Sequence, residues 1–239
     1  MAIKVYIADY KKLGIDKNWQ ELLPYLTGDE REKVLRYRFD EDKIRSLTGV
    51  CLIRSAAAER FPGETVSIMK TDKGKPYLSG RTGYEFNLSH SGDLIVLAVD
   101  ELPIGIDVEQ IKDKNWEIFH RYLTDEEMSM IRGSDDPPAV FFEVWTVREA
   151  FSKEEGQGLS ILDSIFSMDY HEKTVSYNGK KLYFRTEKYS SSEEYRISLC
   201  SRRRLDDVTM EYLDIWDWER RIGLIRQGNG SSQNFHKNY

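Results

Sequence analysis

One order of helices and strands occurs twice along the chain, and this repetition restricts its fold more than any other feature. In each half, a Thr stands three residues before a Glu (Thr27 with Glu30, Thr124 with Glu127), a pairing typical of a helix N-terminus. Longer segments with apolar residues at helical spacing follow, and strand-like segments accompany them. The pattern predicts an α+β protein of two similar lobes, each a small, mainly antiparallel sheet packed with helices.

The expected elements divide at Leu102-Pro103, where a proline separates two strand-like segments. We predict an N-terminal lobe over 1–102 and a C-terminal lobe over 103–239, with a loose polar tail from about 227. Helices are expected from Thr27, from Asp40 to the stop at Phe61-Pro62-Gly63, from Thr124, and from Pro137-Pro138 to Gly156. Strands are expected at 4–10, 66–70, 84–88, 94–100, 104–109, 164–170, 182–186, 195–201 and 208–213.

The net charge of the 239-residue chain is −6 at pH 7, since 41 Asp and Glu outnumber 35 Lys and Arg. This balance argues against a nucleic-acid partner, because proteins that bind nucleic acids usually carry a basic excess. Cys51 and Cys200 are too few for a disulfide scaffold and fit a reducing cytosol. No apolar run has the length of a membrane span or of a signal peptide core, so we expect a cytoplasmic protein without membrane contact.

Two carboxylates stand at alternate positions of the strand expected at 104–109. Because residues i and i+2 of a strand point to the same face, Asp107 and Glu109 project side by side. Two neighbouring carboxylates repel each other unless a positive charge lies between them. If that charge is a metal ion, ligands that are all oxygen atoms suit Mg²⁺ or Mn²⁺. The alternative is that the strand simply ends here and both acids face solvent.

A second group lies on the helix after Pro137-Pro138. Glu149 and Lys153 share one helix face at i and i+4, and Trp145 lies one turn before them. An ordinary surface pair of this kind contributes only about 0.3–0.5 kcal/mol. The functional interpretation is a third metal carboxylate with a cation beside it, which is what phosphoryl transfer requires.

Three further groups are polar or basic. FNLSHSG (86–92) contains Ser89 and His90, and Lys75 is held between a glycine and a proline. Lys33 and Arg45 lie on the first two helices. Taken one by one, these residues are more commonly loop caps or solvated side chains, whereas together they suit phosphate binding.

In chain order, the motifs are Arg45-Ser-Leu-Thr-Gly49, Gly74-Lys75-Pro76, Phe86-Asn-Leu-Ser-His-Ser91, Gly105-Ile-Asp-Val-Glu109, Trp145-Thr-Val-Arg-Glu-Ala-Phe-Ser-Lys153 and Gly156-Gln-Gly-Leu159. The series closely resembles the 4′-phosphopantetheinyl transferase superfamily, specifically its large surfactin-type class. The resemblance extends from the first helix to Leu159 and, more loosely, into the following strands. It implies two lobes related by pseudo-twofold symmetry.

The resemblance also implies an activity. Such enzymes transfer the phosphopantetheine arm of coenzyme A to a serine hydroxyl of an apo acyl, peptidyl or aryl carrier protein and release adenosine 3′,5′-bisphosphate. By similarity, Asp107, Glu109 and Glu149 hold Mg²⁺ (or Mn²⁺), Glu149 acts as the base and Lys153 stabilises the leaving oxygen. His90 resembles a ligand of the 3′-phosphate, and the other cofactor-binding positions are Lys33, Arg45, Lys75, Ser89 and Lys153.

The chain departs from the family pattern at three positions. Arg148 stands where a Lys is more frequent, and Glu30 occupies a place where a basic residue can contact the 3′-phosphate. Ile111 replaces a hydroxyl found in some relatives. The Glu30 difference puts in question how tightly the 3′-phosphate end is held.

The carrier protein has to dock near the metal. The segment Ile111–Leu123 follows Glu109 directly and contains Trp116, Phe119 and Tyr122, so it forms either an apolar docking groove or part of the second lobe's core. With both lobes on one chain, a monomer is expected. Two other classes remain open: a metal-dependent phosphodiesterase or nuclease, and a non-catalytic module that binds coenzyme A or a carrier.

Overall fold

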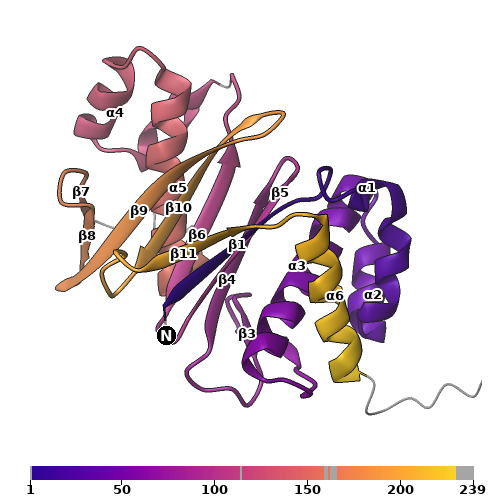
Figure 1. The fold of residues 1–239 in the computed structure, drawn as a ribbon. Coiled ribbons are helices and arrows are strands. Elements are labelled where there is room, and N and C mark those ends of the chain that lie inside the picture. The colour runs from indigo at the N-terminus through magenta and orange to yellow at the C-terminus, as the bar shows by residue number, and fades with distance from the viewer. Residues whose placement is uncertain (1, 114, 159–160, 162–165, 230–239) are drawn as a thin grey trace, which may run out of the picture.

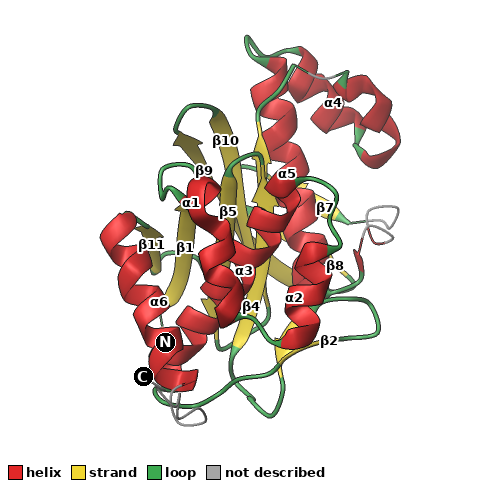
Figure 2. Cartoon of the chain, turned by 90° about the vertical axis from the view of Figure 1, so that its right-hand side faces the viewer, coloured by secondary structure: helices red, strands yellow, loops and turns green. Residues whose placement is uncertain are grey.

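Two mainly antiparallel sheets pack face to face, and helices cover their outer faces (Figures 1 and 2). The arrangement is that of a computed structural model, which describes residues 2–113, 115–158, 161 and 166–229. The predicted α+β fold of two lobes is confirmed. Within the described residues, no helix is both long and apolar enough to cross a lipid bilayer.

The first sheet has the strand order β11-β1-β5-β4. Its strands are β1 (Ile3–Asp9), β4 (Glu85–Ser91), β5 (Leu94–Asp100) and β11 (Val208–Tyr212), and only the β1–β11 pair is parallel. The helices beside it are α1 (Ile15–Asn18), η1 (Trp19–Tyr25), α2 (Gly28–Leu35), α3 (Asp40–Arg60) and α6 (Ile215–Asn229). A separate hairpin pairs β2 (Ile68–Lys70) with β3 (Pro76–Leu78).

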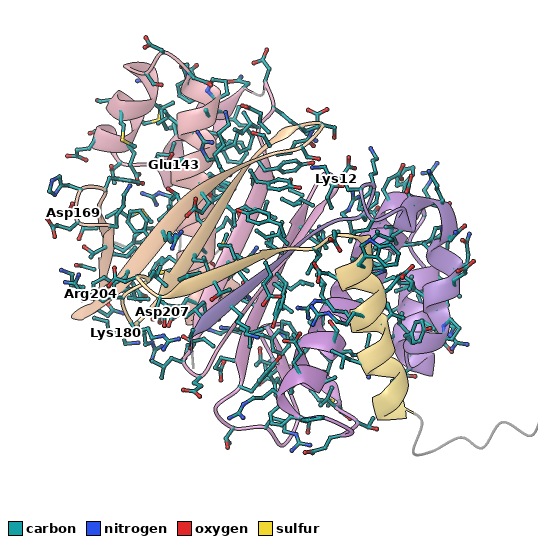
Figure 3. The ribbon with its side chains drawn as sticks, in the orientation of Figure 1. Lys12, Glu143, Asp169, Lys180, Arg204 and Asp207 are labelled. Atoms are coloured by element: carbon teal, nitrogen blue, oxygen red, sulfur yellow. The ribbon has the colours of Figure 1, made fainter. Side chains whose placement is uncertain are left out.

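The second sheet is antiparallel throughout, in the order β6-β10-β9-β8-β7. Its strands are β6 (Ile104–Gln110), β7 (Ser167–Asp169), β8 (Thr174–Tyr177), β9 (Lys180–Ser190) and β10 (Glu194–Ser201). The helices of this lobe are η2 (Trp116–Tyr122), α4 (Asp125–Arg132) and α5 (Pro137–Glu155). Figure 3 shows Lys180, Arg204 and Asp207 together at the end of this sheet that lies away from the helices of the first lobe.

Period-two alternation along the strands divides the apolar residues between separate layers. In β1, Val5 and Ile7 face the second sheet, whereas Tyr6 and Ala8 face α3 and α6. In β6, the buried apolar residues all face the first sheet, which leaves the alternate positions to face α5. The carboxylates of β6 therefore lie on the α5 side, with the shared core behind them.

Both predicted capping boxes are present. The hydroxyls of Thr27 and Thr124 accept hydrogen bonds from the amides of Glu30 and Glu127, whose carboxylates accept in return from the threonine amides. Helix α5 begins at Pro137 and ends at Gly156, which has a φ of 66° that glycine adopts without strain. These local signals fix where the helices that position the site begin and end.

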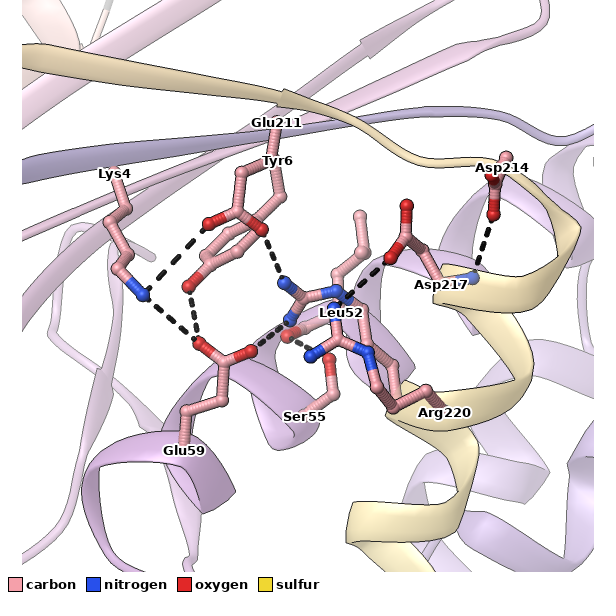
Figure 4. A network of polar contacts seen from close by, with 10 residues as sticks. Lys4, Tyr6, Leu52, Ser55, Glu59, Glu211, Asp214, Asp217 and Arg220 are labelled. Atoms are coloured by element: carbon pink, nitrogen blue, oxygen red, sulfur yellow. Dashed lines mark hydrogen bonds and ion pairs between the residues drawn. The ribbon is translucent and has the colours of Figure 1, made fainter.

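The C-terminal part of the described chain returns to the first lobe, as Figure 1 shows. Strand β11 pairs with β1, and the fully buried Arg221 of α6 forms ion pairs with Glu59 of α3 and Glu211 of β11. Figure 4 shows Lys4 and Tyr6 in contact with the same Glu59. Residues 208–229 thus belong spatially to the N-terminal lobe, although the sequence division at 102/103 assigns them to the second.

The expected strands are present with shifted ends, and six of the described elements are additional. The pattern did not predict strands β3 and β8 or helices α1, η1, η2 and α6. The predicted tail from about 227 overlaps the end of α6 at 227–229, and its remainder lies outside the described residues. Expected residues 164 and 165 also lie outside them.

Candidate active site

Strand β6 lies against helix α5 with no side chain between the two backbones at Gly105. A Cβ atom at this position would lie 1.9 Å from the carbonyl oxygen of Ala150 and 2.6 Å from the amide nitrogen of Glu154. Those distances are far below van der Waals contact, so only glycine permits this approach. The close contact brings the carboxylates of β6 next to the side chains of α5.

A row of polar side chains joins β4 to β6, the neighbouring edge strands of the two sheets. Asn87 Oδ1 accepts a hydrogen bond of 2.9 Å from the Ile106 amide, and Ser91 Oγ accepts one of 3.1 Å from the Gln110 amide. Between them, Ser89 Oγ lies 3.4 Å from the Val108 amide. These contacts satisfy the β6 edge where no main-chain ladder forms, and they fix the register between the lobes.

The same serines orient the carboxylates of β6. Ser89 Oγ donates to Asp107 Oδ1 at 2.8 Å, and Ser91 Oγ donates to Glu109 Oε2 at 2.8 Å. A hydroxyl that donates to a carboxylate while accepting from an amide is fixed in direction. The first lobe thereby orients the carboxylates of the second.

Lys153 of α5 completes this cluster. Its Nζ lies 2.6 Å from Asp107 Oδ1 and 2.8 Å from Ser89 Oγ. Asp107 is 4% exposed, and its other oxygen, Oδ2, is buried without a hydrogen-bond partner among the described residues. That oxygen is available to a ligand or an ion.

Glu149 lies one turn before Lys153, close enough to the carboxylates of β6 to be affected by their negative charge. Burial, and then the charge of Asp107, raises the pKa of Glu149 to about 7; Lys153 offsets part of this rise and Glu109 adds to it. A carboxyl group with a pKa near neutrality can exchange a proton at physiological pH.

The three carboxylates form a donor set suited to a divalent cation. Within the described residues, no three His, Cys, Asp or Glu side chains surround a common point as they are placed. Ser89 and Lys153 contact Asp107, and Ser91 contacts Glu109. However, the unpartnered Asp107 Oδ2 and the raised pKa of Glu149 both indicate negative charge that nearby cations do not fully compensate. All-oxygen ligands of this kind fit Mg²⁺ or Mn²⁺.

A cavity of about 420 Å³ lies on the opposite side of β4. It is bounded by α2, α3, β2 and β4, and His90 points into it whereas its neighbour Ser89 points toward Asp107. Burial, and then the positive charges of Arg45 and Lys153, lowers the pKa of His90. The polar side chains on its walls include Lys33, Tyr37, Ser46 and Lys70.

Two family models together match most of the chain. Residues 14–102 match a model described as 4′-phosphopantetheinyl transferase, N-terminal, and residues 103–200 match one described as 4′-phosphopantetheinyl transferase superfamily. A 4′-phosphopantetheinyl transferase of Bacillus subtilis is 34% identical over 189 residues, which cover 75% of this chain and 84% of the relative. The chain belongs to the 4′-phosphopantetheinyl transferase superfamily.

Further relatives of the transferase support the surfactin-type class. The 4′-phosphopantetheinyl transferase psf-1 of Bacillus pumilus is 32% identical over 216 residues, with 87% of this chain and 91% of the relative covered. The transferase Sfp of Bacillus subtilis strain 168 is 29% identical over 202 residues, with coverages of 80% and 89%. The expected family is confirmed, and the protein is a 4′-phosphopantetheinyl transferase that acts on coenzyme A and a carrier protein.

The predicted site residues of the transferase occupy two regions. Around β6 and α5, the structure brings together Ser89, Asp107, Glu109, Glu149 and Lys153. The cavity behind β4 brings together two further predicted ligands, Lys33 and His90.

Arg45 and Lys75 have other contacts. Arg45 pairs with Asp42 at 2.5 Å and donates to the carbonyl of Gly92 at 3.0 Å, so it connects α3 to the turn between β4 and β5. Lys75 donates to the carbonyl of Glu154 at 3.1 Å, near the C-terminus of α5. Lys75 also lines a smaller hollow between the lobes, together with Lys153.

The departures from the family pattern have defined contacts. Arg148 forms a two-pronged ion pair with the buried Glu127, at 3.2 Å and 2.5 Å, and so connects α5 to α4. Glu30 receives two hydrogen bonds from Arg54, at 2.9 Å and 3.0 Å. Ile111 packs at the margin of the apolar cluster under η2.

Sequence reasoning did not identify Lys70 and Tyr37 as cavity residues. Lys70 ends a short strand, and Tyr37 follows α2. The only signal was a lysine five positions before Lys75, which is too common a feature to single out.

The expected docking segment divides between core and surface. The rings of Trp116 and Phe119 pack against Phe141, and Tyr122 lies edge-on to Trp145. Ile118, in contrast, is 65% exposed. The surface therefore presents Ile118 rather than the larger aromatic residues.

Proposed function

We propose that this enzyme catalyses a Mg²⁺-assisted transfer of the 4′-phosphopantetheine arm of coenzyme A to a serine hydroxyl of an apo carrier protein, releasing adenosine 3′,5′-bisphosphate. The observation that carries the proposal is the meeting of Asp107, Glu109, Glu149 and Lys153 at the contact of β6 with α5. A group of carboxylates alone would suit a metal ion. A lysine beside those carboxylates also suits a phosphate group in the same site.

Asp107, Glu109 and Glu149 are the residues proposed to hold the cation. When bound, Mg²⁺ or Mn²⁺ neutralises charge on the pyrophosphate of coenzyme A and polarises its phosphorus–oxygen bonds. The unpartnered Oδ2 of Asp107 supports this assignment, since a buried carboxylate oxygen without a partner is costly unless a ligand compensates it.

Glu149 is proposed as the base. Its pKa of about 7 allows it to accept the proton of the carrier serine, directly or through one water molecule, as the serine oxygen attacks the β-phosphorus. A new oxygen–phosphorus bond then forms to the phosphopantetheine, and the bond from that phosphorus to the bridging oxygen breaks. The electron pair leaves on the α-phosphate of adenosine 3′,5′-bisphosphate.

Lys153 is proposed to stabilise the departing oxygen. Its Nζ already lies at hydrogen-bond distance from Asp107 and Ser89, so its position is fixed before substrate binds. A charged donor preorganised at the leaving group lowers the barrier without reorganising in the reaction.

The nucleotide is proposed to bind on the first-lobe side. Lys33 and His90 line the 420 Å³ cavity. Burial, and then the positive charges of Arg45 and Lys153, lowers the His90 pKa, and those positive charges favour an anion. The remaining proposed contacts with coenzyme A are Arg45, Lys75 and Ser89.

The carrier is proposed to dock on Ile111–Leu123, with the exposed Ile118 as its principal apolar contact. A monomer is proposed, because the first and second lobes of one chain supply every residue named above. The two free, buried cysteines support a reducing compartment such as the cytoplasm.

The experiment that tests the proposal is mass spectrometry of several apo carrier proteins after incubation with the enzyme, coenzyme A and Mg²⁺. A mass gain of one phosphopantetheine on at least one carrier is expected. A failure with every carrier of a panel of acyl, peptidyl and aryl types contradicts the proposal.

A further inference from the structure

The turn between β4 and β5 lies directly beside the carboxylates of β6. Ser91 ends β4 and pairs with Leu94 of β5. The turn between them therefore consists of Gly92 and Asp93 alone, and Gly92 has a φ of 54°, which glycine adopts without strain. Because Ser91 Oγ donates to Glu109 Oε2 at 2.8 Å, a displacement of so short a turn changes how this carboxylate is held.

Residues of the first lobe hold this turn from one side. Arg45 Nη1 donates to the carbonyl of Gly92 at 3.0 Å. The Tyr10 amide donates to the carbonyl of Asp93 at 3.1 Å, and Lys11 Nζ lies 2.9 Å from the Asp93 carboxylate. These contacts fix the turn within its own lobe, but they do not fix it relative to the carboxylates of β6, which belong to the second lobe.

Tyr195 of β10 holds the same turn from the second lobe. Its hydroxyl accepts a hydrogen bond of 3.2 Å from the Asp93 amide. A Cβ atom at Gly92 would lie 2.8 Å from that hydroxyl and 2.6 Å from Gln110 Oε1, so the turn backbone rests against both side chains. Tyr195 pairs with Gln110 across β10 and β6 and is 1% exposed, so its hydroxyl has a fixed position.

We propose, on the basis of the function proposed above, that Tyr195 is a positioning residue for the transfer reaction: its hydroxyl holds the turn after Ser91, so that Ser91 keeps Glu109 oriented for metal binding. Gln110 completes the connection, because its amide donates to Ser91 Oγ at 3.1 Å. Groups that orient the ligands of a metal from outside the ligand set change its affinity for the protein.

The ring of Tyr195 also belongs to the core between the sheets, where its centroid lies 6.1 Å from that of Tyr189. A substitution that keeps the ring therefore separates the role of the hydroxyl from the packing, and Tyr195→Phe removes the hydroxyl alone. Tyr84→Phe is the matched control. Tyr84 is a buried tyrosine of the first lobe whose hydroxyl has no hydrogen-bond partner among the described residues.

The first measurement is Mn²⁺ binding to the purified full chain by electron paramagnetic resonance, with saturating coenzyme A and no carrier, so that no transfer takes place. We expect Tyr195→Phe to raise the Kd for Mn²⁺ about fivefold, because one hydrogen bond that orients the ligand set is lost. Tyr84→Phe should leave this Kd unchanged.

Transfer assays and thermal unfolding separate this role from a purely structural one. In Tyr195→Phe, the Mg²⁺ concentration that gives half the maximal rate should rise about fivefold, as the Kd for Mn²⁺ does. The kcat at saturating Mg²⁺ should change by less than about twofold, since excess metal refills the site. The melting temperature should fall by no more than about 4 °C.

Ser91→Ala identifies the route of the effect. We expect it to raise the Kd for Mn²⁺ at least as much as Tyr195→Phe does, and Tyr195→Phe should add less than about twofold in the Ser91→Ala background. Should Tyr195→Phe fold poorly, Gly92→Ala displaces the turn from the same hydroxyl and is expected to weaken Mn²⁺ binding as well.

Three results would each overturn the proposal: an unchanged Kd for Mn²⁺ in the folded variants of Tyr195 or Gly92, an equal weakening in Tyr84→Phe, or fully additive effects of Ser91→Ala and Tyr195→Phe. The outcomes separate from those of the proposed function. Transfer by the wild type with unchanged metal affinity in Tyr195→Phe refutes only the Tyr195 assignment. Weakened metal binding in an enzyme that modifies no carrier refutes only the transfer reaction.

Discussion

Ser89 Oγ lies 2.8 Å from Asp107 Oδ1, across the contact between the two lobes. Ser89 belongs to β4 of the first sheet, and Asp107 belongs to β6 of the second. The same hydroxyl accepts from Lys153 Nζ at 2.8 Å. One side chain of the first lobe thus fixes both a proposed metal ligand and the lysine beside it, so the site depends on how the lobes fit together.

The contact of β6 with α5 depends on the absence of a side chain at Gly105. We expect Gly105→Ala to lower the free energy of unfolding by about 3 kcal/mol or more, because the added Cβ meets backbone atoms that cannot turn away. Denaturant unfolding measures this loss. Gly28→Ala is the matched control, because nothing lies within 4 Å of a Cβ there; an equal effect of both variants would contradict the close-contact explanation.

Arg148 uses the planar shape of its guanidinium to bind both oxygens of Glu127. We expect Arg148→Lys to lower the free energy of unfolding by about 1–2 kcal/mol, since an ammonium group satisfies this buried carboxylate with poorer geometry. Arg132→Lys, at a side chain that is 59% exposed, serves as control and should change little. Equal stability of Arg148→Lys and the wild type in denaturant unfolding would show that the two-pronged geometry is unimportant.

The pH dependence of stability should carry a contribution from Glu154. Burial raises the pKa of Glu154 to about 7, although Arg202 Nε lies 2.8 Å away. Between about pH 4.5 and 7 the folded protein keeps a proton that the unfolded chain has released, so stability from this group is lost as pH rises through that window. Thermal unfolding at several pH values measures the slope.

Glu154→Gln is expected to remove that slope, which corresponds to about 3 kcal/mol across the window. The exposed Glu117 supplies the control, Glu117→Gln, which should leave the slope in place. A Glu154→Gln variant with the wild-type pH dependence would rule out this carboxyl as its source.

Carrier docking should depend on Ile118, whose side chain is exposed whereas the nearby rings of Trp116 and Phe119 are partly buried and pack against the apolar cluster. We expect Ile118→Glu to raise the KM for the carrier about tenfold without changing the KM for coenzyme A or the melting temperature, because an apolar contact becomes a charge. Trp216→Glu, at an exposed residue of α6, is the control. Phe119→Ala should instead lower stability, since Phe119 packs against Phe141 and Trp145. An unchanged carrier KM in Ile118→Glu would remove this residue from the interface.

Local signals in the sequence predicted the elements that carry the site. The capping residues Thr27 and Thr124 and the strand from Ile104 to Glu109 lie as expected, because each is specified within a few neighbouring positions. The pairing of β11 with β1 was not predictable. The two strands lie about two hundred positions apart, and the residue pattern of a strand does not indicate which other strand it pairs with.

The candidate site was predicted in its residue types and not in its contacts. Asp107 and Glu109 were expected to share a face, but the pattern alone does not indicate that Ser89 and Ser91 hold them. The position of Lys70 in a cavity was not predicted for a related reason. A lysine at the end of a short strand is a common feature, and only the folded structure places it in the same cavity as Lys33.

The central claim is that the two lobes together form a metal-assisted transfer site around Asp107. The most direct measurement is the mass-spectrometric rate of phosphopantetheine transfer to an apo carrier by the wild type and by Asp107→Ala, with and without Mg²⁺, and with circular dichroism to confirm that the variant folds. We predict that the wild type transfers one phosphopantetheine only when Mg²⁺ is present, and that Asp107→Ala is folded and loses at least about a hundredfold in rate. Transfer by folded Asp107→Ala at a rate near that of the wild type would contradict the claim.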